Sequence, residues 1–342
     1  MINYINQTSY EQVLNSLTSH YAQTKVGPEQ TDLWRLFVFF AANCRHFLEL
    51  DNLAEQRSLF ARVRMNQQLS IWEDAHYSHL PKEATTGLDE HWWQQLRQEP
   101  GIICTFHTGS YRLINHLLLK QGIDFALLVS GKVKQRDGAD FEQRYQKDVE
   151  DGKTLTVLNA EDPSVLFKLR RLLQQGKSLL AYVDGNTGSG SNGIAIPFFG
   201  KEVVVRKGLP MLAHWLDVPI YPLANIRKDE MLTFYALSPI KSSKRINKHD
   251  FALETMQRLY GFLEYTINDY TDQWEGWLHL HHAVTQQFCA EPLLLDLIEN
   301  ADQKAPLLPF ELNGKAFAFN PLTYGSYPIS RDVYCRMLNY FR

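Results

Sequence analysis

The stretch "GIICTFHTGSYRLINHLLLKQG", residues 101–122, decides the fold. Its first part, "GIICTF", is a short apolar run bounded by polar residues, which is typical of a buried strand. The remainder, "GSYRLINHLLLKQG", has the apolar spacing of an amphipathic helix that ends at Gly122. His107 falls at the turn between the two elements. A strand, a turn and a helix in this order form the repeating unit of α/β proteins.

The same alternation continues along the chain. Strands are predicted at residues 125–130, 154–159, 178–184, 219–225 and 227–240, and helices at residues 138–152, 162–176, 206–217 and 246–282. The helix at 162–176 has Asp162 as its cap, Pro163 at the first position and Gly176 at its end. We therefore expect an α/β fold with a mainly parallel sheet flanked by helices.

Two further regions flank this α/β part. Residues 1–87 are predicted to be a helical N-terminal region, in which residues 31–75 contain no Gly or Pro. Residues 286–342 are predicted to be a small α+β appendage with a helix at 292–301, a hairpin turning at Asn313-Gly314 and a last helix at 330–341. The predicted domains are therefore 1–87, 88–285 and 286–342.

Composition excludes several classes of protein. With 342 residues, of which 44% are hydrophobic, the chain has ample material for a large core. Its net charge of −3 provides no bulk cationic field, so general nucleic-acid binding is not expected. The 4 cysteines form no CxxC pair, which argues against a zinc site or a disulfide scaffold and favours the reducing cytoplasm. The longest strongly apolar run, residues 36–42, is shorter than the ~20 residues of a membrane span, so we expect a soluble or peripheral protein.

Two polar loops follow predicted strands, and ligands of open α/β sheets bind beyond the carboxyl ends of strands. His107 opens the first loop, either as a general base or as a histidine bonded to nearby backbone. Asp184 opens the second, "DGNTGSGSNG", in which the backbone at Gly185 and Asn186 would offer N–H groups to an anion. This loop matches neither a P-loop nor a dinucleotide fingerprint, and a flexible active-site flap is the alternative.

Other polar clusters carry weaker signals. The sequence "HLHH", residues 279–282, would suit a metal, but no acidic partner lies nearby, so a surface or core cluster is favoured and no metal or cofactor is predicted. Ser110 lies in "TGSYR", which is not the nucleophile elbow G-x-S-x-G. Ser110 is therefore kept as a candidate for substrate binding and not as a nucleophile.

Four segments in order resemble the lipid A late acyltransferases, which belong to the lysophospholipid acyltransferase superfamily. Residues 99–122 resemble the family's strand, catalytic-histidine loop and helix, and residues 173–186 resemble the strand that leads to its "PDQ" segment. Residues 192–223, which contain "IPFFG", and residues 271–282, "TDQWEGWLHLHH", resemble two further family segments. The resemblance covers about residues 89–285.

The resemblance implies transfer of an acyl group from an acyl-carrier-protein or coenzyme A thioester to a hydroxyl or amine acceptor. It implies that His107 is the general base and that an acid four or five residues later holds the imidazole. Here the fifth residue is Arg112, and no acid lies between His107 and Asp124. Three explanations stay open: Asp184 substitutes as the acid, catalysis needs no acid, or the protein binds thioesters without catalysis. Hydrolysis of acyl thioesters is a further alternative.

The resemblance also suggests contacts for the substrates. Arg112 and Arg206 are candidates for binding donor phosphates, because arginine binds phosphate in a bidentate fork. Phe199 is a candidate lining residue for an acyl chain. The family's N-terminal membrane helix has no counterpart in residues 1–85, so the acceptor is predicted to be soluble or to be a carrier-bound intermediate of natural-product biosynthesis. The expected location is the cytoplasm, and peripheral attachment to the inner membrane is the alternative.

Overall fold

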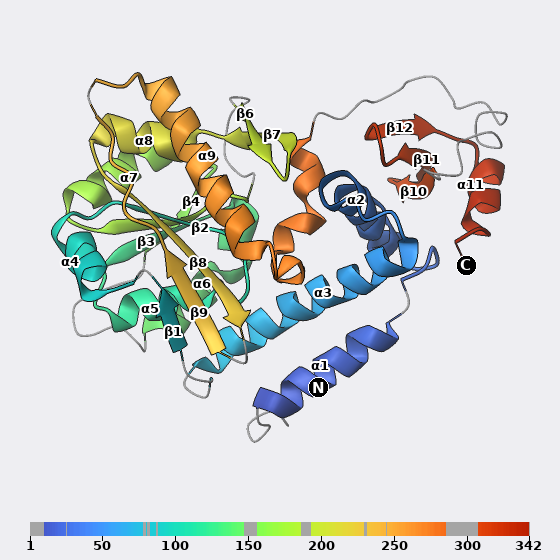
Figure 1. The fold of residues 1–342 in the computed structure, drawn as a ribbon, viewed down its shortest axis with the longest axis horizontal. Helices are drawn as coiled ribbons and strands as arrows, with labels where there is room; N and C mark the ends of the chain where they lie inside the picture. Colours follow the sequence, from blue (N-terminus) through green and yellow to red (C-terminus); the bar gives the residue numbers. More distant parts are fainter. Residues whose placement is uncertain are drawn as a thin grey trace. The chain divides into compact units, whose positions relative to one another are not determined.

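The structure is a computed structural model that describes residues 10–24, 26–77, 80, 83–86, 88–146, 156–185, 193–228, 231–243, 245–284 and 307–341 (Figure 1). Contacts divide the chain into two compact units. The first contains residues 1–15, 66–196 and 205–274, and the second contains residues 16–65, 197–204 and 275–342. The units are interleaved along the sequence, whereas the predicted domains are consecutive segments.

A seven-stranded sheet organises the first unit, in the order β1-β9-β8-β2-β5-β3-β4. Pairing is parallel throughout, except between β8 and β9, which are antiparallel. The strands are β1 (Glu83–Thr86), β2 (Ile102–Thr105), β3 (Phe125–Val129), β4 (Thr156–Asn159), β5 (Ser178–Tyr182), β8 (Ile220–Lys228) and β9 (Met231–Ala236). The predicted α/β class with a mainly parallel sheet is confirmed, whereas β1 was not predicted from the sequence.

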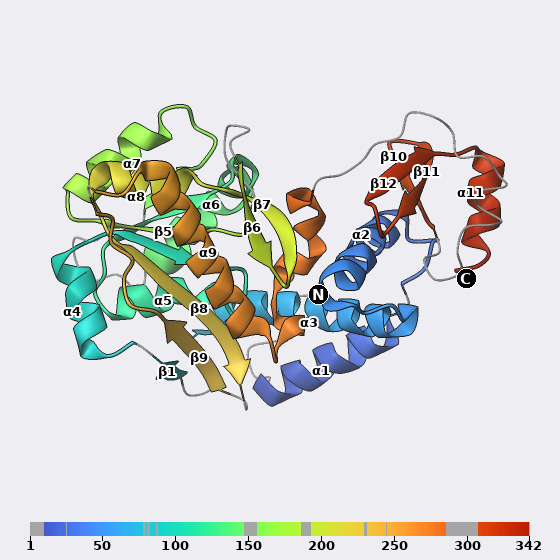
Figure 2. The same cartoon turned by 45° about the horizontal axis from the view of Figure 1, so that its top comes forward.

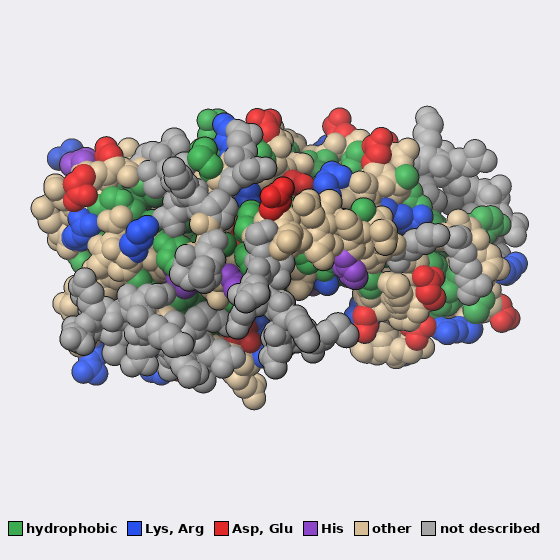
Figure 3. All heavy atoms as spheres, turned by 90° about the horizontal axis from the view of Figure 1, so that it is seen from below, with side chains coloured by type: hydrophobic (Ala, Val, Ile, Leu, Met, Phe, Trp, Pro, Cys, Tyr) green, Lys and Arg blue, Asp and Glu red, His purple; other side chains and the backbone are tan. Residues whose placement is uncertain are grey.

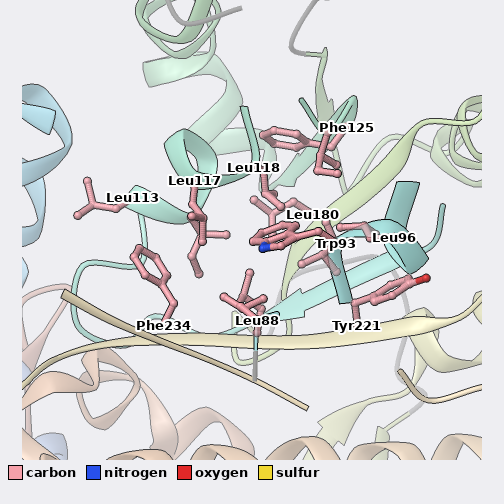
Figure 4. Packing of buried hydrophobic residues seen from close by; sticks show 14 of the residues in the cluster. Leu88, Trp93, Leu96, Leu113, Leu117, Leu118, Phe125, Leu180, Tyr221 and Phe234 are labelled. Atoms are coloured by element: carbon pink, nitrogen blue, oxygen red, sulfur yellow. The ribbon is translucent and has the colours of Figure 1, made fainter. Parts of the chain in front are cut away.

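Helices cover both faces of this sheet. Helices α4 and α5 lie on the opposite side of it from α8 and α9 (Figure 1). The helices of the sheet region are α4 (Glu90–Gln98), α5 (Leu113–Lys120), α6 (Gly131–Gln146), α7 (Val165–Gln174), α8 (Gly208–Leu216) and α9 (Lys248–Ile267). On the side of α4 and α5, the core joins Trp93 and Leu117 to Leu180 and Phe234 from the strands (Figure 4). All four residues of β2 are buried, as its apolar sequence predicts.

The turn between β2 and α5 is longer than the sequence indicates. Gly109 has a φ of +53°, and a Cβ atom there would lie 2.6 Å from the carbonyl oxygen of Asn225 on β8. Only glycine tolerates this backbone conformation and this close approach without strain. The helix therefore begins at Leu113 and not at residue 109, and residues 107–112 form the loop that carries the candidate site.

A hairpin not predicted from the sequence follows the glycine-rich loop. Strands β6 (Gly193–Phe198) and β7 (Lys201–Arg206) pair with each other and turn at Phe199-Gly200, where φ is 48° and 69°. Two consecutive positive φ values are typical of the tight turns that match strand twist. Arg206 is consequently the last residue of β7, and α8 begins two residues later than predicted.

The N-terminal region is helical as predicted, with α1 (Tyr10–Gln23), α2 (Thr31–Leu48) and α3 (Leu53–Ala75). The break between α2 and α3 was not predicted. Glu49 adopts a left-handed conformation with a φ of 53°, and the side chain of Asn52 accepts a hydrogen bond of 2.8 Å from the backbone N–H of Ala54. This left-handed cap and the following side-chain cap end one helix and start the next.

In the second unit, α2 lies beside a three-stranded sheet (Figure 2). This sheet consists of β10 (Leu308–Leu312), β11 (Lys315–Asn320) and β12 (Gly325–Pro328), followed by α11 (Arg331–Leu338). The predicted hairpin turn at Asn313-Gly314 is confirmed, with φ values of 51° and 75°. The predicted helix at 292–301 lies outside the described residues. Acidic and basic side chains of the described residues are interspersed on the face shown in Figure 3.

Candidate active site

His107 and Asp184 meet at the carboxyl edge of the sheet. Strands β2 and β5 are parallel neighbours, with Thr105 opposite Tyr182, and each candidate residue follows its strand by two positions. This equal offset brings Nδ1 of His107 to 2.8 Å from Oδ1 of Asp184. The backbone N–H of His107 also donates to Oδ2 of Asp184, at 3.0 Å. Both residues therefore lie at the same edge of the sheet, just beyond the ends of β2 and β5.

Asp184 is a buried carboxylate that stays ionised. Its side chain is 2% exposed, and burial alone raises the pKa of a carboxyl group. The nearby His107 and the hydrogen bonds from His107 and Trp274 outweigh burial, so the pKa of Asp184 lies below its usual value. Since a carboxylate only accepts hydrogen bonds, the proton of a neutral imidazole belongs on Nδ1 and Nε2 carries the lone pair.

The imidazole of His107 is held by aromatic rings. Tyr182 stacks on it with ring centroids 4.6 Å apart and an interplanar angle of 27°. Tyr111 meets it edge-on at 4.8 Å. The His107 side chain remains 29% exposed, so the ring is oriented on several sides and still reachable from solvent. This combination suits a base that must act on a bound substrate.

The segment at residues 271–274 connects both halves of the pair, and sequence reasoning missed its role. Nε1–H of Trp274 donates to Oδ2 of Asp184 at 2.7 Å. Thr108 forms an isolated antiparallel bridge with Trp274, and the backbone N–H of Gly109 donates to the carbonyl of Gln273 at 2.7 Å. One short segment therefore fixes the histidine loop and the carboxylate together. The quoted stretch "TDQW" contains Trp274, which is the signal that was present in the sequence.

Ser110 is buried, and its hydroxyl donates to Glu73 on α3. The backbone N–H of Ser110 donates to Oδ1 of Asn225 at 2.7 Å. Glu73 also accepts two hydrogen bonds of 2.8 Å from the guanidinium of Arg227 and one of 2.9 Å from Tyr10. The hydroxyl of Ser110 thus belongs to a buried polar network that anchors the histidine loop to α3.

Arg112 occupies the position where the resemblance leads one to expect an acid. Its Nη1 donates to Oγ of Ser70 on α3 at 3.2 Å. Its guanidinium carbon lies 4.4 Å from the ring centroid of Tyr111, which is the ring that contacts His107 edge-on. The side chain at position 112 is therefore a cation near His107, and the carboxylate that contacts His107 is Asp184 from the neighbouring strand.

The other predicted binding residues lie in separate parts of the chain. Gly185 directly follows Asp184, whereas Asn186 lies outside the described residues. Phe199 belongs to the second unit, where its ring centroid is 5.6 Å from that of Trp277. Arg206 is the last residue of β7 and is half-buried.

Of the histidine cluster at residues 279–282, His281 is buried in the second unit, whereas His279 and His282 are exposed. His281 stacks on Phe39 with ring centroids 4.4 Å apart. Burial and the neighbouring His282 and His279 lower the pKa of His281 to about 3. Within the part of the chain that the structure describes, no group of three or more His, Cys, Asp or Glu side chains is arranged to hold a metal ion. The cluster is therefore divided between the core, which contains His281, and the surface.

Comparison with known proteins identifies the family to which the chain belongs. The family model of the bacterial lipid A biosynthesis acyltransferases matches residues 56–282, and the chain belongs to this family. A search of the curated proteins found no match. The matched range includes most of α3, and therefore Ser70 and Glu73, which the predicted boundary at residue 88 leaves outside the acyltransferase domain. None of the helices in the described ranges is long and apolar enough to cross a membrane.

Proposed function

We propose that this chain transfers an acyl group from a coenzyme A or acyl-carrier-protein thioester to an amine or hydroxyl acceptor. The observation that supports this most strongly is the His107–Asp184 pair at the carboxyl edge of a family acyltransferase domain. A partly exposed imidazole held by a buried carboxylate is the arrangement that activates hydroxyl and amine nucleophiles. Asp184 would thus replace the acid that position 112 lacks.

The proposed reaction needs only one base. Nε2 of His107 accepts the proton of the acceptor as the acceptor's oxygen or nitrogen attacks the thioester carbonyl. The tetrahedral intermediate then breaks its C–S bond, and the imidazolium returns the proton to the leaving thiolate. Asp184 stabilises the imidazolium between these steps and keeps Nδ1 protonated. The products are an ester or amide and a free thiol.

Substrate contacts follow from the charges around the base. Arg112, packed on Tyr111, is proposed to bind an anionic group of one substrate, because guanidinium forms bidentate hydrogen bonds with phosphate and carboxylate. Gly185, Asn186 and Arg206 are proposed to bind the donor. Phe199 is proposed to contact an acyl chain. Ser110 is proposed to act through its buried bond to Glu73 and not by touching substrate.

The proposed location in the cell follows from the proposed acyl donors. Coenzyme A and acyl-carrier thioesters are cytoplasmic metabolites, so we propose a cytoplasmic site of action. The acceptor is proposed to be a soluble or carrier-bound intermediate, as in natural-product biosynthesis.

The direct test is incubation of the purified chain with acyl-coenzyme A and acyl-carrier thioesters, with and without a panel of amine and hydroxyl acceptors. Mass spectrometry then distinguishes three outcomes: acylated acceptor, free fatty acid, or intact thioester. Acylated acceptor, lost in His107→Ala and retained in His249→Ala, supports the proposal; His249 is an exposed histidine on α9 and serves as the matched control. Free fatty acid alone would mean hydrolysis, and intact thioester would mean binding without chemistry.

A further inference from the structure

Three large apolar side chains are exposed together on α7 and the end of α8. Leu166 and Phe167 on α7 are 53% and 73% exposed, and Trp215 on α8 is 57% exposed. Single exposed apolar residues are normal on protein surfaces, whereas a group of them marks an interaction site. Helices α7 and α8 lie near each other in both ribbon views (Figure 1, Figure 2).

Helix spacing places these residues on one outward face. Leu166 and Arg170 are four residues apart, as are Phe167 and Arg171, so the four side chains form neighbouring rows. The guanidinium carbon of Arg170 lies 5.2 Å from the ring centroid of Trp215, which joins α8 to this face. The opposite side of α7 is occupied by its buried residues Val165, Leu169 and Leu173. We call Leu166, Phe167, Arg170, Arg171 and Trp215 the α7–α8 patch.

The charge of the patch is positive. Residues 165–174 contain Lys168, Arg170 and Arg171 and no acidic residue. Lys168 is paired with Asp162 at 2.6 Å, so Arg170 and Arg171 supply the cations of the exposed face. Aromatic and aliphatic side chains combined with arginines on a surface helix are the pattern of helices that lie in the interface of a membrane. Tryptophan is also enriched at the level of lipid headgroups.

We propose that the α7–α8 patch docks on an anionic lipid bilayer. Phe167, Leu166 and Trp215 enter the boundary between headgroups and acyl chains, while Arg170 and Arg171 bind lipid phosphates. A bilayer accounts for the α7–α8 patch better than an acidic protein does. An acidic protein would bind the two arginines but would give no role to the three exposed apolar side chains. This proposal does not depend on the reaction proposed for His107.

Docking through α7 would bring the bilayer close to the candidate active site. Helix α7 connects β4 to β5, and it begins at the carboxyl edge of the sheet, where Asp184 follows β5. Leu166 and Phe167 lie in its first turn. A bilayer that contacts this turn approaches the edge of the sheet that carries the candidate active site.

Vesicle co-sedimentation of the full chain tests the proposal. We expect binding to vesicles of phosphatidylcholine mixed with phosphatidylglycerol and much weaker binding to phosphatidylcholine alone. The double variant Phe167→Ser/Trp215→Ser should lower the partition coefficient roughly tenfold or more, and Arg170→Glu/Arg171→Glu should do the same. Tyr265→Ser and Lys248→Glu change an exposed aromatic and an exposed cation on α9 and should bind like the parent.

Two results would overturn the proposal. The first is absence of binding to anionic vesicles, or binding that the patch variants leave unchanged while circular dichroism shows them folded. The second is binding that high salt and charge reversal abolish but Phe167→Ser/Trp215→Ser leaves intact, which would indicate a purely electrostatic partner such as an acidic carrier protein. Turnover of a water-soluble thioester is measured in parallel; it should be equal in the patch variants and the parent, which separates a failure of docking from a failure of the proposed catalysis.

Discussion

Nδ1 of His107 lies 2.8 Å from Oδ1 of Asp184, a carboxylate 77 residues further along the chain. The arginine at position 112 instead packs on Tyr111 and bonds to Ser70. The geometry is possible because β2 and β5 are parallel neighbours in register, so that the second residue after each strand reaches the same edge. A carboxylate from the neighbouring strand of the sheet therefore lies beside a histidine loop that has a cation at position 112.

Asp184→Asn should lower turnover roughly a hundredfold or more. An asparagine keeps the shape of the side chain but neither stabilises the imidazolium nor fixes the Nδ1–H tautomer. Arg112→Glu introduced into this variant should not restore turnover, because it puts an anion where a substrate anion is proposed to bind. Steady-state kinetics of the single and double variants checks both points; rescue by the glutamate would show that position 112 retains the ordinary role of the acid.

The stability of the fold should depend on Asp184 at acidic pH. Its pKa is lowered in the folded chain, so the carboxylate stabilises the fold above the ordinary carboxyl pKa, and this contribution is lost as pH falls through the lowered value. Asp184→Asn should therefore reduce the loss of stability on acidification over that window. Denaturant unfolding at a series of pH values measures this, and an unchanged acid dependence in the variant would contradict it.

Trp274→Phe should reduce kcat with little change in KM. The substitution removes the indole N–H that donates to Asp184 at 2.7 Å and leaves a buried carboxylate short of a partner, at a cost of about 1–3 kcal/mol. The pKa of Asp184 should rise, because one of the hydrogen bonds that lowers it is removed. Trp92→Phe is the matched control, since it removes a comparable indole bond, to the carbonyl of Leu237 at 3.1 Å. Equal effects of both variants on kcat would mean that Trp274 only packs.

Arg112→Ala should raise KM for one substrate and leave KM for the other near its parent value. Loss of a charge-assisted hydrogen bond to a bound anion costs about 1.5–3 kcal/mol. Arg112→Lys should recover part of the affinity, because it keeps the charge without the fork geometry. The check is KM for donor and acceptor separately; if Arg112→Glu performs like the parent, the residue contacts no substrate anion.

Ser110→Ala should destabilise the chain without a change in KM. The hydroxyl is buried and donates to Glu73, whose remaining bonds to Arg227 and Tyr10 persist. Removing one hydrogen bond of a buried network costs about 1–3 kcal/mol. Thermal unfolding and KM measured together separate this outcome from substrate contact, for which KM would rise while the stability stayed the same.

Much of the fold follows from local sequence pattern. The apolar run before His107 and the amphipathic run after it predict a strand and a helix, and repetition of this unit predicts a parallel sheet. The edge shared by His107 and Asp184 follows from the rule that strands of a parallel sheet end on one side. The hairpin of β6 and β7 was missed, because its apolar residues do not alternate regularly and its turn residues are Phe199 and Gly200.

The parts that local pattern did not reveal depend on contacts between distant segments. The bond from Trp274 to Asp184 joins residues 90 positions apart, and that from Ser110 to Glu73 joins residues 37 apart. Neither has a periodicity that a sequence window detects. The late start of α5 has the same origin, because the conformation of Gly109 is imposed by the backbone of Asn225 on β8.

The most direct test of the central claim is a comparison of the acyl-transfer rates of the parent, His107→Ala and Asp184→Asn with the same thioester donor and acceptor, for chains shown to be equally folded by circular dichroism. The account predicts that both variants lose transfer by roughly a hundredfold or more while still binding the donor. Transfer by His107→Ala at a rate close to that of the parent would contradict it.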